Sequence, residues 1–230
     1  ALALAREGAA VVLATRGPRN GRAVEAEIRE RGDRALFVEC DVSQRESVDA
    51  CVGATRKAFG RIDVLVNNAV ANTGRIPLLE HGEEDFRMAF ESGVLGSVYF
   101  MQACHPDLAR RGGRIIDLGS AAGYEGHVAL AGYAAAKEGI RALTRVAARE
   151  WGGDGIRANV LCPFADSPGW TEWEAADPEG AAAFTAARPI ARVGRCEEDI
   201  GRVAVFLASD DSAYLTGATL PVDGGGAMLA

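Results

Sequence analysis

Residues 114–137 of the chain, RIIDLGSAAGYEGHVALAGYAAAK, decide the fold. Their first five residues form a short isoleucine-rich run that is typical of a buried strand, and a cluster of small residues ends it. From Tyr133 the sequence becomes helical, with apolar side chains at Ile140, Leu143 and Val146. A buried strand followed by an amphipathic helix is the repeating unit of a parallel sheet covered by helices.

The same alternation extends along the whole chain. Further strands are predicted over residues 10–14, 35–40, 62–66, 156–161 and 219–222, and helices over 1–7, 19–31, 45–59, 83–111, 133–151 and 199–208. This order predicts a single-domain, doubly wound (Rossmann-like) α/β fold, in which a mostly parallel sheet is flanked by helices on both faces. Because the chain opens partway along a helix, we expect a strand and a turn of roughly 15–25 residues to precede Ala1.

Composition narrows the function classes. The net charge of -7 argues against nucleic acid or an anionic membrane as partners, and no apolar run is long enough to span a bilayer. The five dispersed cysteines lack a CxxC pair and indicate reduced thiols in the cytoplasm. The three histidines, His81, His105 and His127, share no ligand spacing, so we expect no metal site. The class of partner that is left is a small-molecule substrate.

Ligands of doubly wound sheets bind beyond the carboxyl ends of the strands. Asn67 and Asn68 follow the strand at 62–66, and Ser120 follows the strand at 114–118. A side-chain-bonded turn explains either feature equally well when it is considered alone.

Tyr133 and Lys137 lie four residues apart at the start of a helix, so their side chains emerge on one face. A free tyrosine has a pKa of about 10, and a nearby ammonium group favours the phenolate. We therefore predict that Tyr133 exchanges a proton with a substrate oxygen to which Ser120 donates a hydrogen bond. Lys137 would support the tyrosine and reach a ribose hydroxyl. In isolation, such a pair is common on exposed helices.

Together these residues resemble the short-chain dehydrogenase/reductase family, particularly its 3-oxoacyl-carrier-protein-reductase-like members. The resemblance covers essentially the whole chain. The matching motifs are Asn67-Asn68-Ala69, the Ser120, Tyr133 and Lys137 spacing, Arg157-x-Asn159 through Pro163, Leu215-Thr216-Gly217, and Val222-Asp223-Gly224-Gly225.

The resemblance implies an oxidoreductase that interconverts a carbonyl and an alcohol. It implies that Asp41, Val42 and Asn68 contact a nicotinamide dinucleotide together with Tyr133 and Lys137. It also implies a glycine-rich turn before Ala1, and a homotetramer or homodimer that associates through the helices at 83–111 and 133–151 and the strand at 219–222.

The residues at the end of the family fold's second strand, which corresponds to the strand at 10–14 in this chain, indicate which cofactor is bound. An NAD-preferring site usually has a carboxylate there, whereas this chain has Thr15 followed by Arg16, with Arg19 nearby. Arginine binds phosphate in a forked geometry, so the pair favours NADP(H) over NAD(H). The alternative is an ordinary solvated arginine.

Three departures from the family pattern stand out. Val70 replaces the glycine of Asn-Asn-Ala-Gly, Gly93 replaces a helix asparagine that helps to hold a proton-relay water, and Phe164 replaces the glycine of Pro-Gly. Ser92, a water or a helix bulge would compensate for Gly93. Phe164 would lie near the nicotinamide, so a lyase or dehalogenase on the same scaffold is one alternative function. A non-catalytic nucleotide-sensing protein is the other.

Residues 164–195 are predicted to form a substrate lid. Phe164, Trp170, Trp173 and Phe184 would cover an apolar substrate, or pack as an ordinary amphipathic flap. Tyr124, with Glu125 and His127, would line the other side of the pocket.

Overall fold

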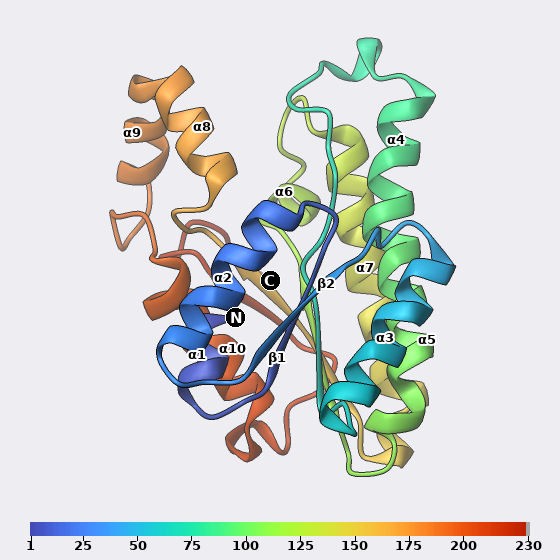
Figure 1. Ribbon diagram of the computed structural model, residues 1–230. Helices are drawn as coiled ribbons and strands as arrows, with labels where there is room; N and C mark the ends of the chain where they lie inside the picture. Colours follow the sequence, from blue (N-terminus) through green and yellow to red (C-terminus); the bar gives the residue numbers. More distant parts are fainter. Residues whose placement is uncertain (229–230) are drawn as a thin grey trace.

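The computed structural model describes residues 1–228 and follows the predicted alternation of strands and helices (Figure 1). The strands are β1 (Val11–Thr15), β2 (Ala35–Glu39), β3 (Val64–Asn67), β4 (Arg114–Leu118), β5 (Arg157–Pro163) and β6 (Thr219–Val222). The α-helices are α1 (Leu2–Arg6), α2 (Pro18–Glu30), α3 (Arg45–Phe59), α4 (Glu83–Ala89), α5 (Gly96–Leu108), α6 (Ala121–Glu125), α7 (Ala131–Glu150), α8 (Pro168–Ala176), α9 (Pro178–Ala186) and α10 (Arg202–Ala208).

All strand pairs in the described residues are parallel, as predicted, but they form two sheets. One sheet contains β1 and β2, and the other has the order β3-β4-β5-β6. Thr15 lies opposite Glu39 in the first, and Asn67 lies opposite Asp117 in the second. Because parallel strands end on the same side, the residues that follow each sheet's strands share one edge.

Helices cover both faces, with α3, α5 and α7 on one side and α1, α2 and α10 on the other (Figure 1). The side chains of β4 alternate accordingly. Ile115 is buried with Val48 and Leu108 of the first group of helices, whereas the adjacent Ile116 is buried with Leu207 of α10. Because adjacent side chains of β4 face opposite layers of helices, both isoleucines are buried. An isoleucine-rich run therefore indicated a central strand of the fold.

The predicted helix at 83–111 is interrupted. The chain forms α4, then a π-helical turn over Phe90–Leu95 that contains Gly93, and then α5. A second π-helical turn, Cys196–Gly201, precedes α10. Glycine weakens a regular helix interior, and π-helical turns occur mostly as such local insertions.

Two lid helices were not predicted. Ser167 accepts a hydrogen bond from Trp170 N at 3.3 Å at the start of α8, and Asp177 accepts one from Gly180 N at 2.9 Å at the start of α9. A proline follows each of these caps. Ser-Pro and Asp-Pro at a helix start are recognisable signals that the many alanines and tryptophans of this segment obscured.

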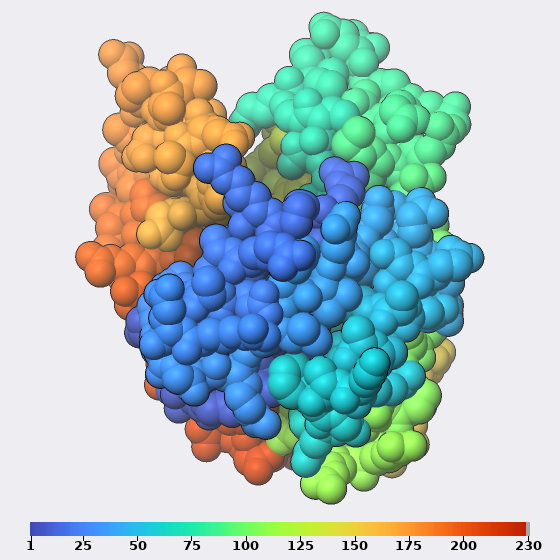
Figure 2. All heavy atoms as spheres, in the orientation of Figure 1, coloured from blue at the N-terminus to red at the C-terminus, as the bar shows by residue number. Residues whose placement is uncertain are grey.

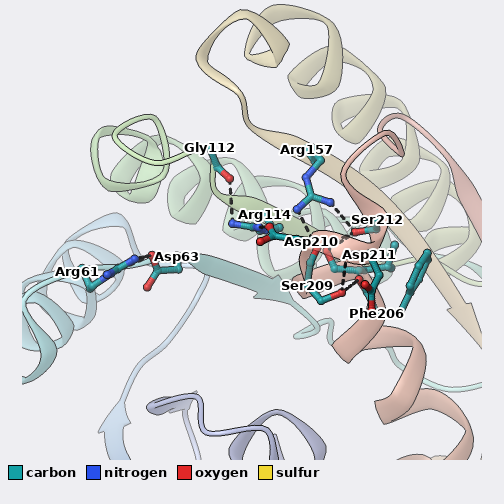
Figure 3. A network of polar contacts seen from close by, with 11 residues as sticks. Arg61, Asp63, Gly112, Arg114, Arg157, Phe206, Ser209, Asp210, Asp211 and Ser212 are labelled. Atoms are coloured by element: carbon teal, nitrogen blue, oxygen red, sulfur yellow. Dashed lines mark hydrogen bonds and ion pairs between the residues drawn. The ribbon is translucent and has the colours of Figure 1, made fainter.

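A polar network fixes the amino ends of the sheet, opposite the candidate site (Figure 3). Arg157, at the start of β5, donates to Ser212 Oγ at 2.5 Å and to Ser209 O at 3.0 Å. Arg114, at the start of β4, pairs with Asp210. These interactions connect the starts of β4 and β5 to the turn after α10. We therefore assign the network a structural role.

In residues 1–228, no helix combines the length and the hydropathy that crossing a membrane requires. The five cysteines are unpaired, four of them buried and Cys196 exposed.

Candidate active site

A cleft opens between the lobe formed by α8 and α9 and the lobe around residues 70–95 (Figure 2). The first lobe is orange in the figure and the second is teal to green, and atoms in the olive colour of the chain around α6 and the start of α7 are visible between them. The floor of this cleft therefore includes that part of the chain.

Ser120 lies directly after β4 and caps the short helix α6. Its backbone is extended, and its Oγ accepts a hydrogen bond from Ala122 N at 3.2 Å. A serine hydroxyl that accepts one bond still has its own hydrogen to donate. The cap thus fixes the position of Ser120 while leaving a donor for a ligand oxygen.

Tyr133 and Lys137 occupy the first turns of α7. Lys137 Nζ lies 5.6 Å from the centroid of the Tyr133 ring and donates to Leu118 O at 2.5 Å. The lysine is only 3% exposed. Helix α7 therefore places both side chains at the strand end that also carries Ser120.

The electrostatics of this group are set mainly by burial. Burial raises the pKa of Tyr133, and hydrogen bonding with the Ser120 side chain lowers it. Burial lowers the pKa of Lys137 to about 8, while Cys162 and Asp117 oppose that change. A lysine with this pKa is mostly protonated at pH 7. A cation therefore lies beside a phenol in a site largely shielded from solvent.

The predicted nucleotide residues Thr15, Arg16 and Asp41 lie at the adjacent ends of β1 and β2. The Asp41 carboxylate accepts hydrogen bonds from Ser43 N at 3.0 Å and Ser43 Oγ at 2.7 Å. These bonds lower the pKa of Asp41, and the nearby Arg16 lowers it further. Arg16 and Arg19 are exposed. The two arginines are thus available to a phosphate at this edge.

Val42 and Asn68 complete the predicted nucleotide edge. A Cβ added to Gly96 of α5 would lie 3.0 Å from the Val42 carbonyl oxygen, so the loop after β2 packs tightly on that helix. Asn68 is exposed after β3. Its neighbour Asn67 is buried and donates to Asp117 Oδ1 at 2.8 Å, which gives Asn67 a structural role.

The aromatic side chains of the predicted lid form one cluster. Trp170 lies 4.7 Å from Phe164 and 5.1 Å from Trp173 between ring centroids, and Phe184 lies 5.2 Å from Trp173 and 5.5 Å from Phe164. Phe164 therefore packs against the lid. Packing within this cluster explains the presence of Phe164, the residue that motivated the lyase or dehalogenase alternative.

Arg188, which follows α9, belongs to the predicted lid segment, but the sequence did not single it out. Its Cζ lies 3.8 Å from the Phe164 ring centroid and 3.9 Å from that of Phe184, and its Nε donates to Asp223 O at 3.1 Å. Burial lowers its pKa. Nothing in the sequence separates this arginine from the exposed ones, because its two ring partners are 24 and 4 positions away.

Tyr124, Glu125 and His127 lie on or just after α6. His127 Nε2 is 3.0 Å from Glu125 Oε2, and the His127 ring is 6.2 Å from that of Phe184. Tyr124 Oη is buried and has no hydrogen-bond partner within residues 1–228. A cavity of about 110 Å³ lies between α6 and α9, lined by Glu125, Phe184 and Arg188 among others.

Two departures from the family pattern touch each other. A Cβ added to Gly93 would lie 3.2 Å from Val70 Cγ2, so the valine occupies space beside the glycine. Ser92 Oγ accepts from Ala71 N at 2.9 Å and donates to Met88 O at 2.7 Å. The Ser92 hydroxyl therefore makes both of its hydrogen bonds within this segment. Of the compensations expected for Gly93, the structure shows the helix bulge, in the form of the π-helical turn over Phe90–Leu95.

Comparisons with known proteins agree with these features. A family model described as enoyl-(acyl carrier protein) reductase matches residues 1–227. The chain is 41% identical over 230 residues to a 12α-hydroxysteroid dehydrogenase from a Clostridium species, covering 98% of this chain and 89% of that protein. It is 37% identical over 229 residues to an L-fucose dehydrogenase from Oryctolagus cuniculus, covering 98% of this chain and 78% of that protein.

The fold agrees as well. The crystal structure of NAD⁺-bound xylitol dehydrogenase has a TM-score of 0.90 and 30% sequence identity, with 97% of this chain and 92% of that chain covered. These similarities in sequence and structure extend over nearly the whole chain and include dehydrogenases that act on alcohols. The chain belongs to the short-chain dehydrogenase/reductase family, whose members are oxidoreductases.

Proposed function

We propose that this protein is an NADP(H)-dependent oxidoreductase that interconverts a ketone or aldehyde and an alcohol on an apolar small molecule. The observation that carries the proposal is the convergence of Ser120, Tyr133 and Lys137 at the end of β4. Lys137 Nζ lies 5.6 Å from the centroid of the Tyr133 ring, and the Ser120 side chain lowers the pKa of the Tyr133 phenol.

In the reducing direction, Tyr133 donates its phenolic proton to the substrate oxygen as negative charge develops there. Ser120 donates a hydrogen bond to the same oxygen and so stabilises that charge. Lys137, which donates to Leu118 O, would offset the charge left on the phenolate and bind a ribose hydroxyl of the cofactor. The nicotinamide, when bound, supplies or accepts the hydride.

The residues at the strand ends fit a dinucleotide. Asp41 with Val42 would hold the adenine, Asn68 would contact the nucleotide after β3, and Thr15 with Arg16 would face the adenosine ribose. Because Arg16 is exposed and no carboxylate ends β1, a 2′-phosphate is favoured over a free hydroxyl. We therefore propose NADP(H), although the xylitol dehydrogenase structure carries NAD⁺. The ratio of kcat/KM for NADPH to that for NADH tests this choice.

The aromatic lid supports an apolar substrate, with Tyr124, Phe164, Trp170 and Trp173 as candidate lining residues. A hydroxysteroid is the first compound to test, because the 12α-hydroxysteroid dehydrogenase shares 41% of its aligned residues with this chain. We also propose that the protein works in the cytoplasm as a homotetramer or homodimer.

Replacing Tyr133 by phenylalanine tests the catalytic assignment. The ring remains and only the proton donor is lost, so Tyr133→Phe is expected to lower kcat by about 10²–10⁴-fold while NADPH still binds. The measurement is NADPH oxidation with a panel of steroid and alicyclic ketones, alongside NADPH binding by fluorescence.

Tyr214→Phe is the matched control, because Tyr214 is fully exposed and is expected to leave turnover unchanged. Wild-type turnover that survives in Tyr133→Phe would remove this tyrosine from the mechanism. NADPH binding without turnover on any ketone would instead favour a nucleotide sensor.

A further inference from the structure

Asp117 is a fully buried carboxyl group that the mechanism above does not use. It lies on β4, one residue before Leu118, whose carbonyl oxygen holds Lys137 Nζ. Its side chain is 0% exposed. A buried carboxyl group is costly to ionise unless hydrogen bonds and opposite charge compensate it.

Both oxygens of Asp117 accept hydrogen bonds. Oδ1 accepts from Asn67 Nδ2 of β3 at 2.8 Å, and Oδ2 accepts from Thr144 Oγ1 of α7 at 2.6 Å. Thr144 lies seven residues after Lys137, so helix α7 directs both side chains towards β4. Two donors and a nearby ammonium group favour the ionised form of this carboxyl.

Burial raises the pKa of Asp117 to about 6, against the effects of Thr144, Asn67 and Lys137. The carboxyl is therefore mostly ionised at pH 7 and above. The other titratable group that favours the charged form of Lys137 is the Cys162 thiol of β5, but burial raises the pKa of that thiol to about 11. Cys162 is therefore neutral in this pH range, and Asp117 supplies the negative charge.

We propose that Asp117 is a positioning residue whose buried carboxylate keeps the ammonium group of Lys137 charged at neutral pH. Without this anion, a lysine that is 3% exposed would lose its proton closer to neutrality and would no longer support Tyr133. The electrostatic claim concerns two groups of the chain alone. Only its consequence for catalysis rests on the proposed function.

The substitution Asp117→Asn isolates the charge. The amide oxygen can still accept from Asn67, and the amide nitrogen can donate to Thr144 Oγ1, whose hydrogen is then directed to Ile140 O, 2.8 Å away. Shape and hydrogen bonding are thus conserved while the negative charge is removed. Thr144→Ser is the matched control, because it removes a buried methyl group next to the carboxyl and keeps both the hydroxyl donor and the negative charge.

The chain allows a direct measurement, because Lys57 and Lys137 are its two lysines. Labelling lysine with ¹³C at Cε gives one signal from each, and Lys57 on α3 is an exposed internal standard. In Asp117→Asn, the Lys137 pKa should fall from about 8 to about 7 or lower, a roughly tenfold loss of proton affinity. The Lys57 signal should be the same in both proteins, and Lys137 in Thr144→Ser should titrate near the wild-type pH.

The wild-type protein provides a second test that needs no variant to fold. Its Lys137 signal should shift near pH 6, as Asp117 ionises, and again near pH 8, as the lysine itself loses a proton. An unchanged Lys137 pKa in folded Asp117→Asn, or a wild-type curve without the step near pH 6, overturns the proposal.

Kinetics then separate this role from the proposed function. If ketone reduction is observed, the alkaline limb of its kcat profile should move to lower pH in Asp117→Asn by the same amount as the Lys137 pKa. If the lysine titration behaves as expected and no ketone is reduced, the electrostatic role of Asp117 stands and the proposed carbonyl reduction fails.

Discussion

At the scale of single residues, Val70 and Gly93 are best understood as a pair. The family pattern has glycine at position 70 and asparagine at position 93. This chain instead has the larger valine at position 70 and glycine at position 93. The structure brings the two positions to within 3.2 Å, measured from Val70 Cγ2 to a Cβ added at Gly93. The two departures therefore compensate each other sterically.

Restoring the asparagine alone should be unfavourable. Gly93→Asn adds a side chain against Val70, so the free energy of unfolding is expected to fall by about 1–3 kcal/mol, the usual cost of overpacking. Combining it with Val70→Gly should recover part of this loss, with a coupling of at least about 0.5 kcal/mol. Urea unfolding of the wild type, the two single variants and the double variant measures the coupling, and strictly additive changes would contradict it.

The residues of the site were predictable to different degrees. Ser120, Tyr133 and Lys137 follow from local spacing on a strand end and a helix start, and the structure places them together. Asp117 and Arg188 were missed because their partners lie far away in the sequence, in β3 and α7 for Asp117 and beside Phe164 and the C-terminal turn for Arg188. Spacing in one chain does not reveal such contacts.

At the scale of elements, Arg188 holds the predicted lid segment in place. Its guanidinium group lies against the faces of both Phe164 and Phe184, whose rings meet edge to face, and it donates to Asp223 O. Arg188 therefore joins α9 to the ends of β5 and β6. Each cation–π contact is worth about 0.5–2 kcal/mol. Their removal should favour opening of the lid without affecting the sheet.

Arg188→Ala should therefore speed amide hydrogen exchange in α8 and α9 by about tenfold or more. Arg188→Lys should restore little, because an ammonium group cannot stack on an aromatic ring and also donate to Asp223 O as a planar guanidinium does. Arg192→Ala is the control, since Arg192 pairs with Asp199 in the same connecting segment at 2.6 Å. Exchange measured by mass spectrometry that is equal in Arg188→Ala and Arg192→Ala would show that the clamp has no such role.

Element boundaries show where sequence periodicity stops being informative. The helix predicted over 83–111 keeps its apolar pattern through the π-helical turn at Phe90–Leu95, because one extra residue per turn hardly alters a pattern read over two or three turns. The lid helices α8 and α9 lack a strong apolar stripe because they carry alanine and aromatic residues on several faces. The N-capping residues Ser167 and Asp177 were the better sequence signal for these two helices.

At the scale of the whole molecule, exposed apolar side chains lie along the helices that the family resemblance assigned to assembly. Phe90 and Leu95 flank Gly93 in the π-helical turn and are 38% and 42% exposed, and Val146 on α7 is 47% exposed. Burying such side chains between copies of the chain would stabilise an oligomer by about 25 cal/mol per Å².

We accordingly expect light scattering to give a mass of two or four chains for the wild-type protein. Val146→Arg should shift the distribution towards smaller species while leaving the circular dichroism spectrum unchanged, because an unpaired charge is costly to bury. Lys57→Glu, an exposed change on α3, serves as the control. A monomeric wild-type protein would contradict the proposed assembly.

The distance along the chain between the two ends of the predicted cofactor site has a further consequence. Arg16 follows β1, in the first tenth of the chain, while Lys137 of α7 donates to Leu118 O of β4. A dinucleotide that contacts both residues would link segments that are far apart in the sequence. Because such a ligand binds the folded chain and not the unfolded one, its binding free energy would add to the free energy of unfolding.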